Sequence, residues 1–499
     1  MSKRFGRRVA AAVGLMASAA LLLAGCAGGG SAGGGGDRIK IAMMQPPTAA
    51  LNPFSDDVAK LSRWSTGETL VRLNDKIEIE PLLATEWKQV DDLTWVFTLR
   101  DDVTFHDGTP FNAAAVKNTL DKAVSATTPP RALNGVKIST EATGEYEVTI
   151  TTDTPDPLLT NRLASPQLSI FSEAAYRDDG TISPIGTGTG PFELTDVNGT
   201  TTATLERYDG YWGEKAKAAG IDVDFVPDGT ARAGAIRSGE ADGAESIPVS
   251  QVTLLDPQQV NEVFMPRTTF LTLNSESGPF ADPAVRAAAR AAIDPKGIVD
   301  TVYEGQADPA DGLLGPALPW AEKLRGNIES ATEPAKVDGV PITLATYSDR
   351  AENPEIAVQL QKQLEEAGFV VTQDVREYVN MEEEMLGGGF DAVIISRNIL
   401  LDTGDPLSFF SQDFTCSGGF NVAQLCDAGV DGIVQKGLQA TGDARQQAAM
   451  DAEAAILRLD SVVPLVHERV VQAEAGTFTN VVRDPLERRL ITEQTAPAG

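Results

Sequence analysis

The sequence has 499 residues, of which 42% are hydrophobic and 22% charged, and its formal net charge is −30. This length is typical of about three domains, and the hydrophobic share excludes wholesale disorder because it suffices for a large core. The excess of 71 Asp and Glu over 41 Lys and Arg argues against nucleic acid as a partner and against docking on anionic lipid through a basic patch.

The N-terminus has the pattern of an export signal. Four basic residues lie within the first eight positions, and an apolar stretch over residues 9–24 follows, which is short for a membrane span. Leu23-Ala-Gly-Cys26 comes where such a signal is cleaved, and it resembles the lipobox of bacterial lipoproteins. We therefore predict a signal peptide over 1–25 and an acylated Cys26. An ordinary signal peptide with a chance cysteine is the alternative, and Arg7-Arg8 leaves general or twin-arginine export open.

The next segment is a predicted tether. Residues 27–36 contain only glycine, alanine and serine, so they lack side chains that pack, and they would span about 17 Å root-mean-square as a flexible chain. We predict that the lipidated cysteine and tether occupy 26–36 and that the folded body starts near Asp37. The protein would then be extracytoplasmic and anchored by lipid to the outer face of the cell membrane.

Two further cysteines, Cys416 and Cys426, remain once Cys26 carries lipid. An even pair in an exported protein predicts a disulfide, which would stabilise the fold by about 3 kcal/mol. Two buried free thiols are the alternative. Zinc has less support, because the two cysteines lack the close spacing of a metal site and the chain has only His106 and His467 as histidines.

Along the body, short alternating or apolar runs interleave with capped helical segments. Asp282-Pro283 is an N-cap followed by a first-turn proline, and Asn353-Pro354 opens another helix that Gly368 would end. The predicted strands cover residues 38–42, 94–99, 146–150, 369–375 and 390–395, and the predicted helices cover 284–293 and 353–367. This alternation indicates an α/β protein.

A search for catalytic motifs finds none. The sequence lacks a Gly-x-Ser-x-Gly elbow, a His-Glu-x-x-His helix and a P-loop, and His467-Glu468 has no second histidine. The glycines of 186–190 have the wrong spacing for a dinucleotide site, so we predict a tight chain reversal there. His106 lies in a turn between apolar residues, which favours a hydrogen-bonded structural histidine. We therefore expect that the protein is not an enzyme and that it holds neither a cofactor nor a metal ion.

The stretch Trp95-Val-Phe-Thr-Leu-Arg-Asp-Asp-Val-Thr-Phe-His-Asp-Gly-Thr-Pro-Phe111, with Ala114-Ala-Val116 after it, resembles the signature of the family 5 extracellular solute-binding proteins. These are the peptide- and nickel-binding receptors of bacterial ABC importers. Blocks that resemble the same family follow in the same order and extend the resemblance over nearly all of residues 38–480. They are Gly188–Phe192, Tyr208–Gly213, Asp282–Asp294, Asn353-Pro354 and Asp405–Phe410.

The resemblance implies a two-lobed periplasmic-binding-protein fold of the cluster C type, which has a hinge and an extra α/β domain. The first lobe would comprise 37–52, 186–274 and 476–499, the extra domain 53–185, and the second lobe 275–475. The implied partners are a small solute and the transmembrane subunits of an ABC permease, and we expect a monomer.

The resemblance also implies a ligand. Dipeptide-binding members pair an Asp with the peptide's α-amino group and an Arg with its carboxylate, and the matching positions are Asp402, three residues before Asp405-Pro406, and Arg350, three before Asn353-Pro354. Arg397 lies at a predicted strand end near the cleft. Short peptides are therefore the expected ligand. Ile399-Leu-Leu401 replaces the Trp-Thr-Gly of dipeptide binders, which leaves a nickel chelate, a sugar, or a hydrolase on a similar scaffold as alternatives.

Overall fold

The computed structural model describes residues 37–74, 77–177, 179–400 and 403–498. The predicted signal peptide, Cys26, the tether and Asp402 lie outside the described residues. Within the described ranges, no helix has both the length and the apolar character needed to cross a membrane.

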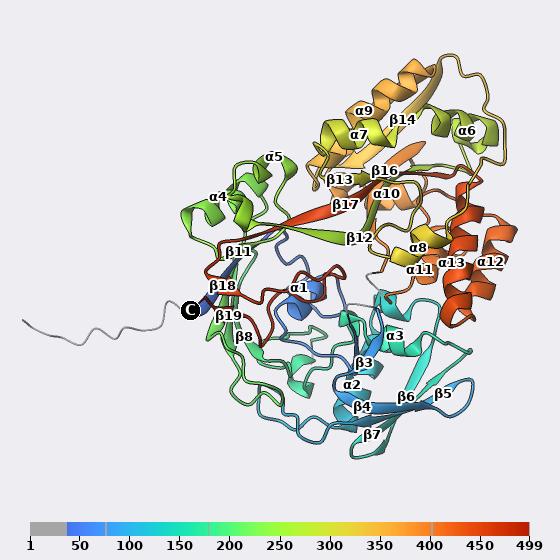
Figure 1. Cartoon of the computed structure of the whole chain (residues 1–499). Helices are drawn as coiled ribbons and strands as arrows, with labels where there is room; N and C mark the ends of the chain where they lie inside the picture. The colour runs from blue at the N-terminus through green and yellow to red at the C-terminus, as the bar shows by residue number, and fades with distance from the viewer. Residues whose placement is uncertain (1–36, 75–76, 178, 401–402, 499) are drawn as a thin grey trace, which may run out of the picture. The chain divides into compact units, whose positions relative to one another are not determined.

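A large mixed sheet runs through both halves of the body, which spans residues 36–499 (Figure 1). Its core is made of alternating apolar positions, such as Ile39 and Ile41 in the first strand, which are 0% and 2% exposed. In spatial order, the described strands of this sheet are β15 (Phe369–Arg376), β14 (Val340–Tyr347), β16 (Ala392–Asn398), β12 (Val260–Leu273), β17 (Val462–Glu474), β11 (Gly243–Ala244), β1 (Arg38–Met43), β10 (Gly220–Phe225), β9 (Thr202–Arg207) and β8 (Phe192–Asn198), with β13 (Ala307–Pro309) beside β17.

The long strands β12 and β17 connect the two halves of this sheet. The first half contains β11, β1, β10, β9 and β8, and the second half contains β15, β14 and β16. β12 pairs with β16 on one side, whereas β17 pairs with β11, which in turn pairs with β1. The register between β12 and β17 shifts between Phe264 and Thr268, where Pro266 lacks an amide hydrogen for the ladder. Such a bulge bends the strand and redirects side chains. Next to this bulge, Arg267 stays paired with Asn398 of β16, and Glu468 of β17 pairs with Ala307 of β13.

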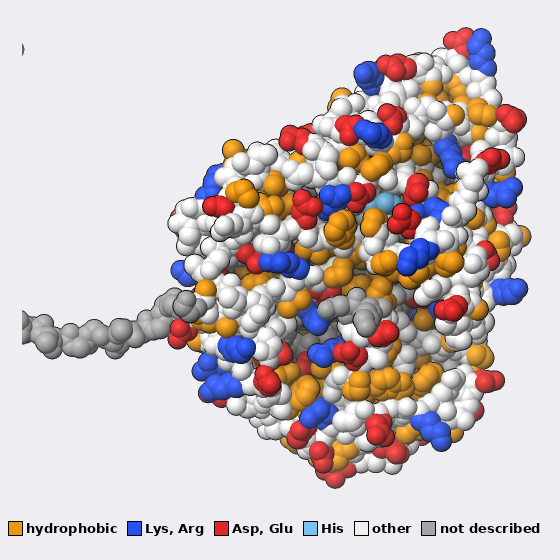
Figure 2. All heavy atoms as spheres, viewed as in Figure 1, with side chains coloured by type: hydrophobic (Ala, Val, Ile, Leu, Met, Phe, Trp, Pro, Cys, Tyr) orange, Lys and Arg blue, Asp and Glu red, His pale blue; other side chains and the backbone are white. Residues whose placement is uncertain are grey.

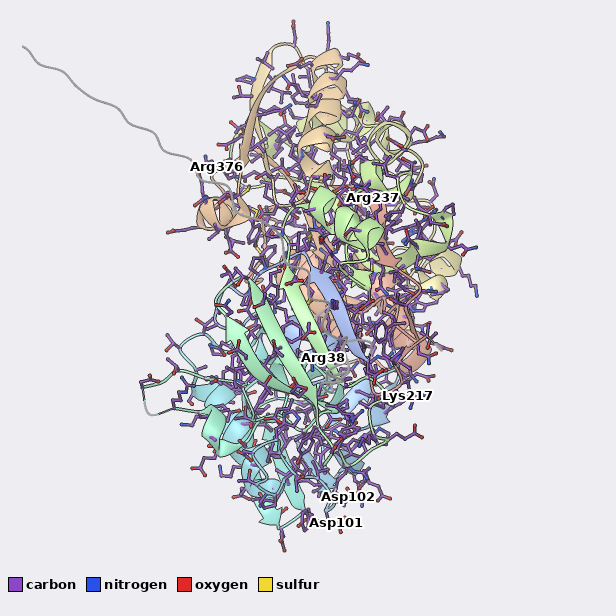
Figure 3. The ribbon with its side chains drawn as sticks, turned by 90° about the vertical axis from the view of Figure 1, so that its left-hand side faces the viewer. Arg38, Asp101, Asp102, Lys217, Arg237 and Arg376 are labelled. Carbon is purple, nitrogen blue, oxygen red and sulfur yellow. A yellow bond between two sulfur atoms is a disulfide. The ribbon has the colours of Figure 1, made fainter. Side chains whose placement is uncertain are left out.

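Ion pairs of Arg38, which Figure 3 labels, connect neighbouring strands in the half of the sheet that contains β1. Arg38 of β1 pairs with Asp222 of β10 at 2.7 Å and with Glu206 of β9 at 2.7 Å. Arg376, at the end of β15, lies above Arg38 in the same view.

A separate antiparallel sheet forms the core of the segment between residues 84 and 152. It is covered by a helix whose N-cap, Asn112, accepts hydrogen bonds from Ala114 and Ala115. The strands, in spatial order, are β4 (Ala84–Gln89), β5 (Thr94–Leu99), β7 (Glu147–Thr152) and β6 (Ile138–Gly144), and the helix is α2 (Ala113–Ser125). Two short hairpin-like pairs complete the strands: β2 (Val71–Leu73) with β3 (Ile79–Pro81), and β18 (Phe478–Thr479) with β19 (Ala496–Pro497).

The helices agree with the caps in the sequence. Asp282 accepts a hydrogen bond from Ala284 N at 2.9 Å, and Gly368 has a φ of +106° and a place where a Cβ would lie 2.3 Å from Val337 O. The helix after β14 begins at Glu352, one residue before the predicted start. The described helices are α1 (Val58–Arg63), α3 (Leu159–Leu163), α4 (Gly229–Ser238), α5 (Val249–Val252), α6 (Pro283–Ala292), α7 (Pro295–Val302), α8 (Pro319–Leu324), α9 (Glu352–Glu366), α10 (Glu382–Leu386), α11 (Pro406–Asp413), α12 (Ala428–Leu438) and α13 (Gly442–Leu457), besides α2.

The predicted strands are all present, with small differences at their ends. The strand predicted at 390–395 begins only at Ala392, because Asp391 uses its side chain to accept a hydrogen bond from Thr343 N at 2.8 Å. The strand predicted from Tyr146 begins at Glu147.

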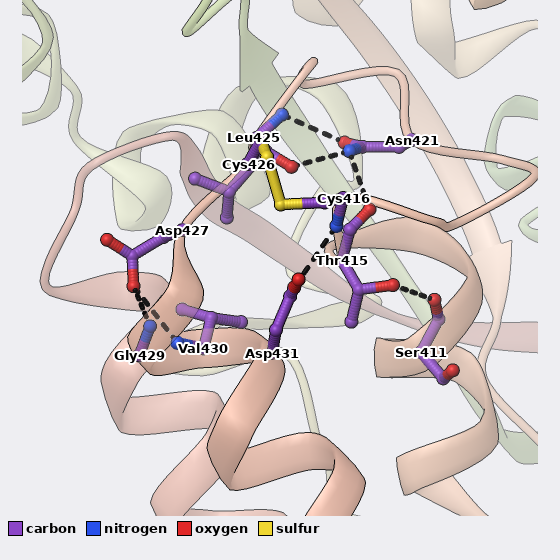
Figure 4. The surroundings of a disulfide bond; sticks show 10 residues. All are labelled: Ser411, Thr415, Cys416, Asn421, Leu425, Cys426, Asp427, Gly429, Val430 and Asp431. Atoms are coloured by element: carbon purple, nitrogen blue, oxygen red, sulfur yellow. Dashed lines mark hydrogen bonds between the residues drawn. A yellow bond between two sulfur atoms is a disulfide. The ribbon is translucent and has the colours of Figure 1, made fainter.

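A disulfide joins Cys416 to Cys426 (Figure 4). It closes the loop between α11 and α12, in which Asn421 donates hydrogen bonds to Thr415 O and Leu425 O and accepts one from Leu425 N. Asp431 of α12 accepts a hydrogen bond from Cys416 N at 3.1 Å. The loop is thus held both by the disulfide and by hydrogen bonds between its backbone and the side chains of Asn421 and Asp431.

Reducing this disulfide should lower the free energy of unfolding by about 3 kcal/mol, because the cross-link removes loop entropy from the unfolded chain. Urea denaturation of the protein with and without a reductant measures the change, and a double Cys416→Ser, Cys426→Ser variant should match the reduced protein. Equal midpoints in oxidised and reduced samples would contradict the prediction. Peptide mapping without reduction checks the pairing itself.

The glycine-rich turn at 186–190 packs against the loop that follows α1, as the predicted chain reversal requires. A Cβ on Gly188 or Gly190 would lie 2.0 or 1.9 Å from Thr66 O or Ser65 O, so only glycine fits. His106 Nε2 is 2.9 Å from Gly190 O, and burial lowers the pKa of this imidazole to about 4. The prediction of a hydrogen-bonded turn histidine is confirmed.

Glu68, in the same region, is a buried carboxyl group with neutral partners. Thr189 Oγ1, Tyr211 OH and Trp212 Nε1 donate hydrogen bonds to it at 2.7, 3.0 and 3.0 Å. Burial raises the pKa of the Glu68 carboxyl to about 7, although these hydrogen bonds act in the opposite direction. Glu68 also lines a cavity of about 780 Å³.

This carboxyl group should make stability depend on pH. The folded pKa of about 7 exceeds the ordinary value of 4.5, so the folded protein binds more protons than the unfolded chain between these two pH values. The free energy of unfolding should therefore fall as pH rises from 4.5 to 7, by about 3 kcal/mol from this group. The difference between wild type and Glu68→Gln in denaturation experiments across this range isolates the effect. A difference that does not change with pH would contradict it.

Candidate ligand-binding site

Arg350 lies in the connection between β14 and α9. β14 is parallel to both β15 and β16, so the ends of these strands and the residues after them meet at one edge of the sheet. This edge is where open α/β sheets bind ligands. The sequence position of Arg350, directly after a strand and before a helix, is therefore consistent with a role in binding.

A buried carboxylate, Glu468 of β17, holds the Arg350 side chain. Arg350 Nη1 donates to Glu468 Oε2 at 2.8 Å, and the two side chains are 23% and 7% exposed. Glu468 Oε1 accepts from Thr269 Oγ1 at 2.6 Å and from Ser396 Oγ. Both oxygens of Glu468 are thus bonded, and Arg350 keeps a partly exposed guanidinium in a defined position.

The charges of this pair stabilise each other. Burial would raise the pKa of the Glu468 carboxyl, but Arg350 and Arg267 lower it below its ordinary value. Burial would also lower the pKa of the Arg350 guanidinium, but the Glu468 charge raises it above its ordinary value. Both groups therefore stay charged, and the pair presents a fixed cation toward the cavity.

A second ion pair lies beside the first and involves the C-terminal segment. Arg267 of β12 and Asn398 of β16 are directly opposite each other in the sheet. Both donate to Glu487 Oε2, Arg267 Nη2 at 3.1 Å and Asn398 Nδ2 at 2.8 Å. The bulge in β12 positions Arg267 for this contact.

Arg350, Arg267 and Glu487 of these pairs line a cavity of about 230 Å³ between the halves of the body. From the first half, Arg63 at the end of α1 and its partner Glu245 line the same cavity, and so does Arg131, which pairs with Asp56 at 2.6 Å. Figure 2 shows basic and acidic side chains next to each other around the hollow of this face. The lining therefore combines five arginines, Arg488 among them, with the carboxylates of Asp56, Glu245 and Glu487.

Arg397, the other predicted binding arginine, lies in an adjoining cavity of about 530 Å³. Its guanidinium binds Asp413 through two hydrogen bonds of 2.7 and 2.8 Å and lies 4.0 Å from the centre of the Phe420 ring. Arg131 lines both this cavity and the one at Arg350. Arg350 and Arg397 thus line two cavities that share Arg131.

The other predicted site residues lie near Arg397 or outside the described residues. Ile399 and Thr403 line the cavity that contains Arg397, whereas Asp402 lies outside the described residues. The roles of Asp402, Arg350 and Arg397 in binding stay predictions. Among the described residues, no group of three His, Cys, Asp or Glu side chains is arranged to hold a metal ion.

Sequence reasoning missed Arg267, Glu468, Glu487 and Arg63. In the sequence, Glu468 stands out only as part of an incomplete His-Glu-x-x-His motif. Pro266 inside a strand pattern is the one signal of the bulge that places Arg267 in the cavity. No signal in the sequence points to Glu487, because it reaches the site from a segment far away in the chain.

The chain resembles known proteins over most of its length. The family described as Bacterial extracellular solute-binding proteins, family 5 Middle, matches residues 78–421. The Nickel-binding protein NikA of Staphylococcus aureus is 27% identical over 413 residues, which cover 80% of this chain and 82% of that protein. The Glutathione-binding protein GsiB of Escherichia coli is 28% identical over 456 residues, which cover 86% of this chain and 89% of that protein.

A solved structure has the same fold. The dipeptide binding protein from Pseudoalteromonas sp. SM9913, in complex with Met-Leu, superimposes with a TM-score of 0.79 at 20% identity and covers 92% of this chain and 100% of that chain. This likeness confirms the predicted two-lobed periplasmic-binding-protein fold with its mixed α/β sheet. Because the family matches more than half of the chain, this protein belongs to the family 5 bacterial extracellular solute-binding proteins, the substrate-binding receptors of ABC importers.

Proposed function

We propose that this receptor captures short peptides in the cavities between its lobes and delivers them to an ABC permease. The observation that carries the proposal is the position of Arg350. Its guanidinium is held by the fully bonded Glu468 and still lines the cavity. An arginine fixed in this way can bind a carboxylate through its remaining N–H groups at little cost in side-chain entropy.

The charges around Arg350 favour a zwitterion over a polyanion. Arg63, Arg131 and Arg267 each pair with a carboxylate of the protein, so much of the positive charge of the lining is balanced. A peptide matches such a lining because it carries one ammonium and one carboxylate group. We propose that Arg350 binds the carboxylate, that Asp402 accepts the ammonium group, and that Arg397 contributes to the adjoining cavity.

The relatives support the same class of ligand. One solved structure of this fold contains the dipeptide Met-Leu, and a sequence relative is named for glutathione, which is itself a tripeptide. With both ends of the ligand held in one lobe, the distance between Asp402 and Arg350 would limit the peptide's length. Short peptides should therefore bind more tightly than long ones.

Ligand identity is tested directly with the purified protein. Denaturing the freshly purified receptor should release bound peptides, which mass spectrometry detects. Calorimetry with di- to pentapeptides should show binding that requires free termini. The same peptide pool should remain chemically intact after incubation, which separates a receptor from a hydrolase. Failure of every peptide to bind, or cleavage of the pool, would overturn the proposal.

A nickel chelate is the second candidate. The relative NikA of Staphylococcus aureus is named for nickel, and a solved structure of that protein is described in complex with Ni(L-His)2. The described residues offer no cluster of metal ligands, so nickel would bind through an organic chelator whose carboxylates contact arginines. Calorimetry with nickel and histidine together, compared with histidine alone, distinguishes this candidate from a peptide receptor.

The proposed cellular setting follows the sequence. We propose a monomeric lipoprotein, anchored through Cys26 to the outer face of the membrane, with lobes at 37–52, 186–274 and 476–499 and at 275–475, and the extra domain at 53–185. Closure of the lobes about the strands β12 and β17 would enclose the ligand.

The anchor should depend on Cys26. The mature protein is expected to begin at a lipid-modified Cys26 and to fractionate with membranes, because acylation requires the thiol. Cys26→Ser should release the protein or leave the precursor uncleaved, as shown by fractionation and N-terminal mass spectrometry. Wild-type protein that is secreted with Ala27 or a later residue at its N-terminus would contradict this.

A further inference from the structure

Glu487 reaches the cavity from the C-terminal segment through an uncommon backbone conformation. Its φ is +57°, in the left-handed region that non-glycine residues rarely adopt. Asp484 stabilises this turn, because its carboxylate accepts hydrogen bonds from the backbone N–H groups of Leu486, Arg488 and Arg489. The chain is thus bent so that the Glu487 carboxylate points at β12 and β16.

The Glu487 carboxylate is held by donor groups of the kind that bind an anion. Arg267 and Asn398 donate to its Oε2 atom, and its side chain remains 23% exposed. Burial would raise the pKa of the Glu487 carboxyl, but the charges of Arg267 and Arg63 and the hydrogen bond from Asn398 lower it to about 2. Glu487 is therefore ionised at any pH at which the protein works.

The hydrogen-bonding groups of Arg267 are not all satisfied, and the same holds for Arg63, whose Nε atom is also buried without a partner among the described residues. Arg350 and Arg63 have their own carboxylate partners, Glu468 and Glu245, within the protein. Arg267 contacts Glu487 through Nη2, while its Nε atom is buried without a hydrogen-bond partner among the described residues. A carboxylate in a different orientation can accept hydrogen bonds from both Nε and Nη2 of Arg267, because arginine commonly binds carboxylates through two parallel bonds.

We propose that Arg267 and Asn398, with the charge of Arg63 behind them, form an anion subsite that Glu487 fills, and that Glu487 thereby determines the ligand class. While Glu487 is present, a ligand with an acidic group at this position would be repelled, and ligands that are neutral or zwitterionic there are admitted. This inference deepens the proposed function and rests on it only for the identity of the peptides. The subsite itself consists of described residues.

The first test uses small molecules and does not depend on peptides. Succinate is a dianion of the right chemistry, and succinamide is its neutral counterpart of similar shape. Glu487→Gln keeps the size of the side chain and removes its charge, so the variant should bind succinate at least tenfold more tightly than wild type in calorimetry, with no change for succinamide. Equal succinate affinity in wild type and variant would overturn the inference.

Two further variants make the result specific. Glu474→Gln removes an ion pair with Arg483 in the same C-terminal region, outside the cavity, and should behave like wild type. Arg267→Gln combined with Glu487→Gln should abolish the gain for succinate. If the glutamine variant gives little folded protein by circular dichroism, Glu487→Ser removes the charge with a smaller side chain and gives the same comparison.

A peptide arm separates this inference from the proposed function. The comparison uses a peptide with an Asp or Glu side chain and the same peptide with Asn or Gln in its place. The affinity for the acidic peptide, divided by the affinity for the amide peptide, should be at least tenfold higher in Glu487→Gln than in wild type. If succinate binding shows the gain and no peptide binds either protein, the subsite stands and the peptide proposal fails. If peptides bind and neither succinate nor the acid-to-amide ratio responds, the peptide proposal stands and the subsite is refuted.

Discussion

Replacing Arg350 by methionine is expected to weaken the binding of peptides with a free C-terminal carboxylate by roughly 30- to several-thousand-fold. The substitution leaves the ligand's carboxylate in a desolvated cleft without its partner, which typically costs about 2–5 kcal/mol. A peptide whose C-terminus is amidated lacks this charge, so the variant should no longer distinguish it from the free acid. Calorimetry on matched acid and amide peptides measures both effects.

Substitutions at two other positions of the chain accompany Arg350→Met in the same assay. Arg376, whose partners Asp374 and Glu384 lie outside the cavity at Arg350, serves as the matched arginine, and Arg376→Met should bind like wild type. Asp402→Ala should abolish discrimination against N-acetylated peptides in the same assay. If Arg350→Met and Asp402→Ala both keep wild-type affinity and selectivity, the peptide ends are held elsewhere.

Replacing Glu468 by leucine is expected to lower the free energy of unfolding by about 3–5 kcal/mol, because it leaves the Arg350 guanidinium partly buried without its counter-charge. The hydroxyl groups of Thr269 and Ser396 lose their acceptor at the same time. Urea denaturation followed by circular dichroism measures the loss. A change below about 1 kcal/mol would show that Arg350 finds another partner and is not held by Glu468.

A double variant separates the charge from the packing. Arg350→Met together with Glu468→Leu removes both charges, so it should recover a large part of the stability lost in Glu468→Leu, since apolar pairs commonly replace buried ion pairs without net loss. The double variant should still fail to bind peptides, because the carboxylate-binding group is absent. Equal stability of the single and double variants would contradict a coupled pair.

Local sequence patterns determined much of the secondary structure and the fold class. The Asp282 cap with its adjacent proline, the Gly368 stop and the alternating residues of β1 and β5 each depend on interactions within a few residues, which is why they are predictable. The even pair Cys416 and Cys426 is likewise close in the chain. The ordered motifs between Trp95 and Phe410 identified the family, and through it the two-lobed fold.

The composition of the cavity was decided by the tertiary structure alone. Arg267 and Glu487 are separated by 220 positions, and Arg350 and Glu468 by 118. They meet because β12 and β17 pair with a shifted register around Pro266 and because the C-terminal segment turns back so that Glu487 reaches β12 and β16. Register over long sequence separations depends on packing across the whole sheet, not on local preference. For this physical reason the sequence could indicate Arg350, but not the carboxylate that holds it or the Glu487 carboxylate beside it.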